Sequence, residues 1–312
     1  MRLLIVKPSS LGDIVHGLVA AEAIRTRLPG VRIDWVVREL FAPVVKACPT
    51  VDRVYVFERR GGLRGFRRLI REIRETRYDV VLDMQGLARS ALIARLAKAD
   101  RRIGRADARE GASWLVSESA PLPPPPSHAV DKLLAFLGPL GIADRSPGIP
   151  DFPGLALPAG ATDLPAGRAI VLFPDSRRPE KEWPYFRELT ATLLDRLPSA
   201  PVVWAGQSRL EPDPAWPPDR FVNLCGKTSL PEAIALIRHA ALCVCNDSGP
   251  MHIAAAVGTP VVALFGPTDP RLYGPYPLSR PTHRVLTAPG GELARLLPAA
   301  VAAEVEALAD AR

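Results

Sequence analysis

The chain has 312 residues, which exceeds the size of one ordinary hydrophobic core and predicts two domains. Its apolar content of 47% is that of a globular protein, and no apolar run approaches the roughly 18 residues of a membrane span. The net charge of +7 is concentrated in residues 59–77, where eight arginines and two glutamates leave a charge of +6 in one segment.

The first half of the chain alternates apolar strand patterns with helix patterns. We predict strands at 2–6, 32–37, 53–57, 78–84 and 101–104, and helices at 13–28, 41–48, 59–77 and 88–99. Alternation of this kind indicates a parallel sheet with helices on both faces.

Proline separates this half from the next. The run PLPPPP at 121–126 excludes a helix or a central strand, and a helix is predicted at 128–141. The stretch 146–167 is rich in proline and glycine and is interpreted as a linker. The predicted domains are therefore 1–155 and 156–312.

The second half repeats the α/β pattern. Strands are predicted at 169–173, 201–206, 220–225, 242–245, 260–266 and 283–287, and helices at 184–197, 230–240, 249–258 and 291–311. The fold class is thus α/β, with two tandem Rossmann-like, doubly wound domains. Ligands of such sheets bind beyond the carboxyl ends of the strands, which predicts a site in a cleft between the domains.

Several familiar motifs are absent. The sequence has no G-x-G-x-x-G after the first strand, no G-x-x-x-x-G-K-S/T and no G-x-S-x-G. Dinucleotide oxidoreductases, P-loop enzymes and hydrolases of the nucleophile-elbow type are therefore disfavoured. No Asp-x-Asp metal clamp is present either. The four cysteines lack zinc-ligand spacing and are expected to be inert core thiols in a reducing compartment.

Asp13 follows the first strand, within the segment KPSSLGDIVHG. It could simply complement the dipole of the following helix, with Ser9 or Ser10 as the N-cap. Alternatively, a carboxylate at this strand end could take a proton from an attacking hydroxyl, while Gly12 lets a substrate approach the backbone.

The segment NDSGPMHIAAAVG places Asp247, Ser248 and Gly249 where a buried strand hands over to a helix, with His252 in the first turn. The arrangement could be only a cap and a turn. Free N–H groups at such a terminus can also bind an anion, and the diphosphate of a sugar nucleotide would suit it. Lys181, otherwise a solvated loop lysine, could offset charge on a leaving diphosphate.

The arginine-rich segment predicts an amphipathic helix. Arg60, Arg64, Arg67, Arg71 and Arg74 share one face, and Leu63, Phe66, Ile70 and Ile73 should face the core. A helix face that carries only positive charge favours an anionic partner. Nucleic acid is one candidate, but aromatic residues do not interleave with the arginines, so base stacking is not supported and no nucleic-acid partner is expected. A phosphorylated lipid acceptor or an anionic membrane surface fits as well.

Taken together, LLIVKPSSLGDIVHGL, YDVVLDMQGLARSAL, HAVDK, KEWP, KTSL and NDSGPMHIAAAVGTPVVALFGPTDP resemble the bacterial ADP-heptose glycosyltransferases, most closely those of the heptosyltransferase I type. The resemblance covers nearly the whole chain and implies a GT-B fold with an acceptor-binding first domain and a donor-binding second domain. It implies inverting, metal-independent transfer of L-glycero-D-manno-heptose from ADP-heptose to a Kdo residue of lipid A, with no cofactor. A cytoplasmic enzyme, peripheral on the inner membrane, is expected.

The same resemblance implies roles for individual residues. Asp13 matches the catalytic base, and Gln85, Arg89, Arg60 and Arg64 fall in acceptor-binding positions. The donor-binding positions are Ser10, Gly12, Ser176, Lys181, Glu211, Thr228, Asp247, Ser248, Gly249 and His252. Glu211 matches a ribose-binding glutamate only with a shift of one residue, and Ser248 stands where related sequences often have threonine.

Three alternatives remain at this stage. The acceptor could be that of heptosyltransferase II, another glycan or a protein. The fold would also suit a sugar-nucleotide epimerase, which needs no acceptor. A basic protein that binds polyanions without catalysis would show salt-sensitive binding and no affinity for an ADP-sugar.

Overall fold

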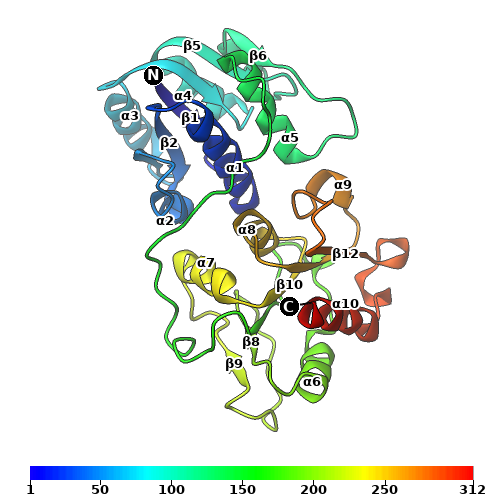
Figure 1. Ribbon diagram of the computed structural model, residues 1–312. Helices are drawn as coiled ribbons and strands as arrows, with labels where there is room; N and C mark the ends of the chain where they lie inside the picture. Colours follow the sequence, from blue (N-terminus) through cyan, green and yellow to red (C-terminus); the bar gives the residue numbers. More distant parts are fainter. Residues whose placement is uncertain (312) are drawn as a thin grey trace. The chain divides into compact units, whose positions relative to one another are not determined.

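The computed structural model describes residues 1–311, which divide into two compact units, the first Met1–Pro153 and the second from Gly154 onward. Each unit contains its own six-stranded sheet, and every strand pairing in both sheets is parallel (Figure 1). The predicted pair of doubly wound α/β domains is confirmed.

The sheet of the first unit has the strand order β3-β2-β1-β4-β5-β6. Its strands are β1 (Arg2–Val6), β2 (Arg32–Arg38), β3 (Arg53–Phe57), β4 (Arg77–Asp83), β5 (Lys98–Arg105) and β6 (Glu118–Ala120). Because the chain builds outward from β1 in one direction and from β4 in the other, the sheet has its topological switch point between these two strands. In parallel sheets, this is where loops diverge and leave room for a ligand.

Helices flank the first sheet. They are α1 (Leu11–Arg27), α2 (Ala42–Lys46), α3 (Gly62–Ile73), α4 (Ala88–Leu96) and α5 (Ala129–Leu134), with 3-10 turns at Glu39–Phe41, Ala112–Leu115 and Ala135–Leu140. Ser10 is the N-cap of α1, and its backbone N–H donates to the Asp13 carboxylate at 3.0 Å. This reciprocal cap explains why α1 starts two residues before the predicted position.

Helix α3 corrects the predicted helix at 59–77. It begins at Gly62, so Arg60 lies in the preceding turn, and it ends at Ile73. The prediction that Leu63 faces the core is wrong, because its side chain is 75% exposed. Leu69 is buried instead, and it packs with Phe66, Ile70 and Ile73 against one core cluster.

Other boundaries also differ from the predictions. Helix α4 ends at Leu96 because β5 begins at Lys98, earlier than predicted, and the helix predicted at 128–141 is part α-helix and part 3-10 helix. The short strand β6 and helix α9 were not predicted, since neither is long enough to show a period.

The second unit repeats the topology, with strand order β12-β11-β10-β7-β8-β9 and its switch point between β10 and β7. Its strands are β7 (Ile170–Phe173), β8 (Val202–Trp204), β9 (Phe221–Asn223), β10 (Leu242–Asn246), β11 (Val261–Phe265) and β12 (His283–Thr287). Its helices are α6 (Phe186–Arg196), α7 (Leu230–His239), α8 (Gly249–Val257), α9 (Pro270–Tyr273) and α10 (Pro298–Asp310), with 3-10 turns at Pro179–Lys181, Pro289–Gly291 and Leu293–Arg295.

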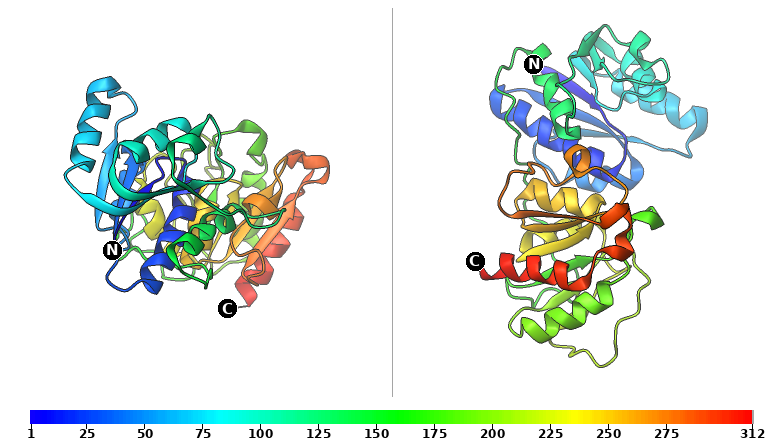
Figure 2. Two further views of the ribbon diagram at one scale, coloured as in Figure 1. Left: turned by 90° about the horizontal axis from the view of Figure 1, so that it is seen from above. Right: turned by 90° about the vertical axis from the view of Figure 1, so that its right-hand side faces the viewer.

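Helices α10 and α6 lie side by side in the second unit (Figures 1 and 2). Between them and the sheet, Trp183 is buried, and its indole N–H donates to the Leu296 carbonyl at 2.8 Å. The helix predicted at 291–311 starts only at Pro298, because proline disfavours helical geometry in the residue before it.

The four cysteines are free thiols. Cys48, Cys243 and Cys245 are buried, whereas Cys225 is half-buried. Burial raises the pKa of all four thiols, that of Cys225 to about 11. Within residues 1–311, no helix combines the length and the apolar character needed to cross a bilayer.

Asn246 holds the switch point of the second sheet together. Its side chain is fully buried at the end of β10. The amide NH₂ donates to the Pro174 carbonyl at 3.0 Å, beyond β7, and the amide oxygen accepts from the Trp183 backbone at 3.1 Å. This single side chain therefore connects β10, β7 and the loop that precedes α6.

We expect Asn246→Ala to lower the free energy of unfolding by about 2–4 kcal/mol, because it leaves a buried N–H and a buried carbonyl unpaired. Urea unfolding of both proteins measures the difference, with the exposed Gln207→Ala as the control. Equal stability of Asn246→Ala and the native chain would contradict a structural role for the bridge.

Candidate functional site

The first group of predicted residues gathers at the switch point of the first sheet. Asp13, in the first turn of α1, accepts hydrogen bonds at Oδ2 from the Ser10 backbone at 3.0 Å and from the Ser10 hydroxyl at 2.7 Å. Its Oδ1 lies 3.4 Å from the Lys7 ammonium. Gln85, beyond β4, accepts from the Ser9 backbone at 3.4 Å, and Gly12 is half-buried beside Asp13.

The Asp13 carboxylate is held in its ionised form. Partial burial alone would raise its pKa, but Lys7 and the two hydrogen bonds from Ser10 outweigh burial and hold the pKa below its usual range. The Asp13 side chain is nevertheless 42% exposed. A partly exposed carboxylate that stays ionised can accept a proton from a hydroxyl brought to it.

The other predicted acceptor residues lie along α3 and α4. Arg60 and Arg64 are exposed, the first in the turn before α3 and the second on its first turn. Arg89, on the first turn of α4, has its guanidinium carbon 5.7 Å from the centre of the Phe57 ring. Because Phe57 ends β3, this contact places Arg89 near the chain segment that leads to Arg60.

Sequence reasoning missed a charged cluster at the end of β5. Arg105 forms two hydrogen bonds to Asp107, at 2.8 and 2.9 Å, and Lys132 of α5 lies 3.3 Å from the same carboxylate. The hydrogen bonds from Arg105 lower the pKa of Asp107 to about 2. The feature that could have revealed the cluster is Arg105, the basic residue that ends β5, but the predicted strand stopped at residue 104.

A second group gathers at the switch point of the second sheet. Asp247 follows β10, and its Oδ2 accepts from the Lys181 ammonium at 2.5 Å and from the Thr268 hydroxyl at 2.6 Å. The Asp247 side chain is 6% exposed and that of Lys181 is 14% exposed. The second sheet thus carries a nearly buried ion pair at the carboxyl ends of β10 and β7.

Ser248 is the N-cap of α8, and its hydroxyl is buried without a hydrogen-bond partner among residues 1–311. Gly249 begins the helix, and His252 lies on its first turn, half-buried. A buried hydroxyl left without a partner beside the free N–H groups of a helix start can bind an anion.

The remaining donor residues lie on neighbouring loops. Ser176, beyond β7, donates its backbone N–H to Glu182 at 2.9 Å. Thr228 is half-buried in the loop before α7. Glu211 is exposed in the long loop between β8 and β9, and no hydrogen bond or ion pair ties it to another of residues 1–311. The assignment of Glu211 to the donor site therefore stays a prediction.

Asp175 is a further residue that the sequence did not single out. Its carboxylate accepts from the Gln207 backbone at 3.0 Å and so connects the loops after β7 and β8. The contact requires glycine at 206, because a Cβ there would lie 2.1 Å from Asp175 Oδ1. Burial raises the pKa of Asp175.

Three comparisons with known proteins identify the family. Residues 66–288 match glycosyltransferase family 9 (heptosyltransferase). Lipopolysaccharide heptosyltransferase 1 of Escherichia coli O18:K1:H7 is 33% identical over 330 residues, covering 98% of this chain and 97% of that protein. Lipopolysaccharide heptosyltransferase 2 of Escherichia coli K12 is 28% identical over 302 residues, covering 86% of this chain and 84% of that protein.

The solved structure of E. coli heptosyltransferase WaaC with ADP matches with a TM-score of 0.82 and 28% identity, covering 99% of this chain and 100% of that one. The chain therefore belongs to glycosyltransferase family 9, the heptosyltransferases.

Proposed function

We propose that this heptosyltransferase transfers L-glycero-D-manno-heptose from ADP-heptose to a Kdo residue of lipid A, with inversion at the anomeric carbon. The observation that carries the proposal is the complementary chemistry of the two switch points. One presents an ionised carboxylate, and the other presents a lysine, an unpartnered hydroxyl and a helix N-terminus. Displacement of ADP from a sugar needs both a base and an anion site.

The first unit supplies the base. Asp13 takes the proton of an acceptor hydroxyl while the hydroxyl oxygen forms its bond to C1 of heptose. Ser10 occupies Oδ2 of the carboxylate through two hydrogen bonds, whereas Oδ1 accepts one, from Lys7, so Oδ1 keeps a lone pair for this proton. Gln85 and the arginines of α3 and α4 are proposed to bind the acceptor.

The second unit receives the leaving group. As the bond from C1 to the phosphate oxygen breaks, the electron pair leaves with ADP. Lys181 and the start of α8 offset the added negative charge, and the Ser248 hydroxyl donates to the diphosphate. Asp247, which orients Lys181, accepts hydrogen bonds from heptose hydroxyls. Transfer requires that the Asp13 carboxylate reach the acceptor hydroxyl while that hydroxyl attacks the sugar held by these groups.

The sequence comparison supports the Kdo acceptor. Identity is 33% over 98% of the chain to a heptosyltransferase 1, against 28% over 86% to a heptosyltransferase 2. The second candidate is therefore transfer to an acceptor that already carries a heptose. Choice between the two lies in the acceptor-binding loops of the first unit.

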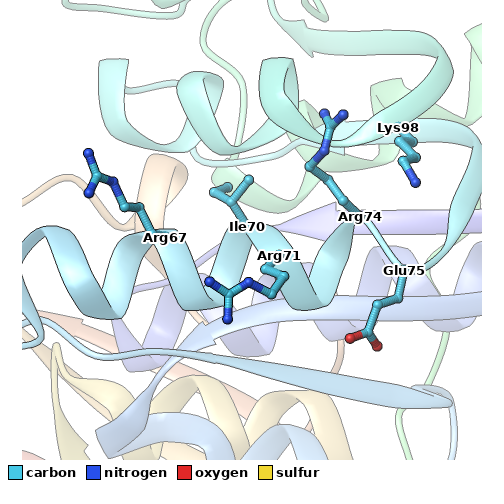
Figure 3. Close-up of a pocket in the computed structure, with 6 residues that line it drawn as sticks. All are labelled: Arg67, Ile70, Arg71, Arg74, Glu75 and Lys98. Carbon is cyan, nitrogen blue, oxygen red and sulfur yellow. The ribbon is translucent and has the colours of Figure 1, made fainter.

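We also propose that α3 meets the anionic inner face of the membrane that contains lipid A. A pocket of about 520 Å³ is lined by Arg67, Ile70, Arg71, Arg74, Glu75 and Lys98. Figure 3 shows Arg67 and Arg71 on α3, Arg74 directly after the helix, and Lys98 alongside at the start of β5. The exposed Leu63 lies on the same helix face as Arg67 and Arg71, which gives the face an apolar residue that can enter a lipid interface.

The acceptor and the base are tested together. We expect the purified enzyme with ADP-heptose to modify Kdo-lipid A and to leave a heptosylated acceptor unchanged. Asp13→Ala should bind ADP with native affinity in calorimetry and lose transfer by at least about 100-fold, the low end for general-base removal. Preferential use of the heptosylated acceptor would favour the second candidate, and native turnover in Asp13→Ala would remove the assigned base.

Ser248→Ala tests the anion site. We expect unchanged stability, because the hydroxyl has no partner to lose, and about tenfold weaker ADP binding. Ser229→Ala is the matched control, since the Ser229 hydroxyl caps α7 by accepting from the Glu232 backbone. It should lose about 1 kcal/mol of stability and keep native ADP affinity. Native ADP binding by Ser248→Ala would contradict the proposed site.

The double variant Arg67→Glu with Arg71→Glu tests the membrane face. We expect its binding to vesicles with anionic phospholipid to weaken by at least roughly 30-fold, because losing each arginine near a charged surface costs about 1 kcal/mol and each added glutamate is also repelled. Arg187→Glu with Arg196→Glu on α6 changes the net charge equally and serves as the control in flotation assays. Equal loss in both double variants would indicate that net charge alone decides binding.

A further inference from the structure

We propose that Lys7 is a positioning residue for the transfer reaction, whose buried ammonium fixes the orientation and the charge of the Asp13 carboxylate. The inference rests on the proposed role of Asp13 as the base. Lys7 lies directly after β1, and its side chain is 1% exposed. A lysine is almost never buried this far unless its ammonium is paired.

The ammonium has two partners at the switch point. Nζ lies 3.4 Å from Asp13 Oδ1 and donates to the Met84 carbonyl at 3.2 Å. Met84 follows β4, so Lys7 connects the ends of the two strands that flank the switch point and points its charge at the carboxylate. Since Ser10 holds Oδ2 and Lys7 holds Oδ1, both carboxylate oxygens are restrained from the protein side.

The lysine stem passes through space that the fold leaves open for it. A Cβ at Gly17 of α1 would lie 3.1 Å from Lys7 Cδ and 2.8 Å from Trp35 Cη2. The Trp35 indole N–H donates to the Lys7 carbonyl at 3.1 Å. Gly17 of α1 therefore leaves room for the lysine stem, and Trp35 of β2 holds the Lys7 backbone.

Other charged groups face the same point. Asp83 of β4 and Arg105 of β5 act on Lys7, and His16 on the next turn of α1 acts on Asp13. Burial lowers the pKa of Lys7 and raises that of Asp83. Lys7 is the cation that forms the hydrogen bond with Asp13. Without the Lys7 charge, the largest electrostatic effect that offsets burial of Asp13 is lost, so the pKa of Asp13 should rise.

The test is the pH dependence of transfer in Lys7→Met, a variant that keeps the length and apolar stem of lysine. The native acid limb of kcat/KM should lie below about pH 4, and in Lys7→Met it should move upward by at least about one pH unit. Lys46→Met removes an exposed lysine of the same unit and should leave the profile unchanged. A profile for Lys7→Met that is lower in rate but native in shape would overturn the proposal.

A second measurement does not depend on turnover. Carboxyl ¹³C NMR of the full chain, with the Asp13 signal assigned through Asp13→Asn, follows its titration directly. Lys7→Met should raise its midpoint, and Gly17→Ala, which crowds the Trp35 ring and the lysine stem without removing the charge, should raise it less. An unshifted Asp13 titration in both variants would also overturn the proposal.

The two proposals fail in different ways. If Asp13→Asn retains native turnover, Asp13 is not the base and the proposed mechanism fails, whatever the Lys7 variants do. If Asp13→Asn is inactive while the Asp13 titration and the pH profile of Lys7→Met stay native, the mechanism stands and the role of Lys7 fails.

Discussion

The switch point of a parallel sheet is the constraint on which both candidate sites depend. Where successive strands are added in opposite directions, the loops beyond two neighbouring strands separate, and their backbone groups lose the neighbours that strand pairing would provide. In this protein a buried polar side chain spans each such gap. Lys7 reaches the Met84 carbonyl in the first sheet, and Asn246 reaches the Pro174 carbonyl in the second.

The two gaps carry the same pair of residue types with opposite exposure. In the first, the lysine is buried and the aspartate faces outward; in the second, the aspartate is the more buried partner and the lysine the less. The exposed Asp13 carboxylate suits a proton to be removed, and Lys181, the less buried partner of the second pair, suits a phosphate to be held. In one unit the residue nearer to solvent is the acidic partner, and in the other it is the basic partner.

Much of this could be predicted from the sequence, for identifiable reasons. Strands such as 2–6 and 53–57 match the structure because each is a short apolar run that follows an arginine and ends before polar or charged residues. Asp13 and Asp247 stood out because they follow such runs, and strand ends define the edge where ligands bind. Helix α3 was predicted, but it begins at Gly62 rather than residue 59, and Leu63 on its first turn is exposed instead of in the core.

What could not be predicted depends on contacts between distant segments. Nothing in the sequence near Lys7 indicates that Met84 would be its partner, and the unpartnered Ser248 hydroxyl is visible only once its surroundings are known. Arg105 and Lys132 both form ion pairs with Asp107, although they are 27 residues apart in the sequence. No local sequence pattern indicates this pairing. Glu211 forms no hydrogen bond or ion pair with another of residues 1–311, so its assignment to the donor site stays a prediction.

The state of the cysteines has a practical consequence. With three thiols buried and the fourth disfavoured as a thiolate, the native chain should be nearly inert toward maleimides at neutral pH. A cysteine introduced on the surface of each unit would then be the principal point of attachment for a spin label or a fluorophore. Such a doubly labelled protein would report the distance between its halves as substrates bind, without prior removal of native cysteines.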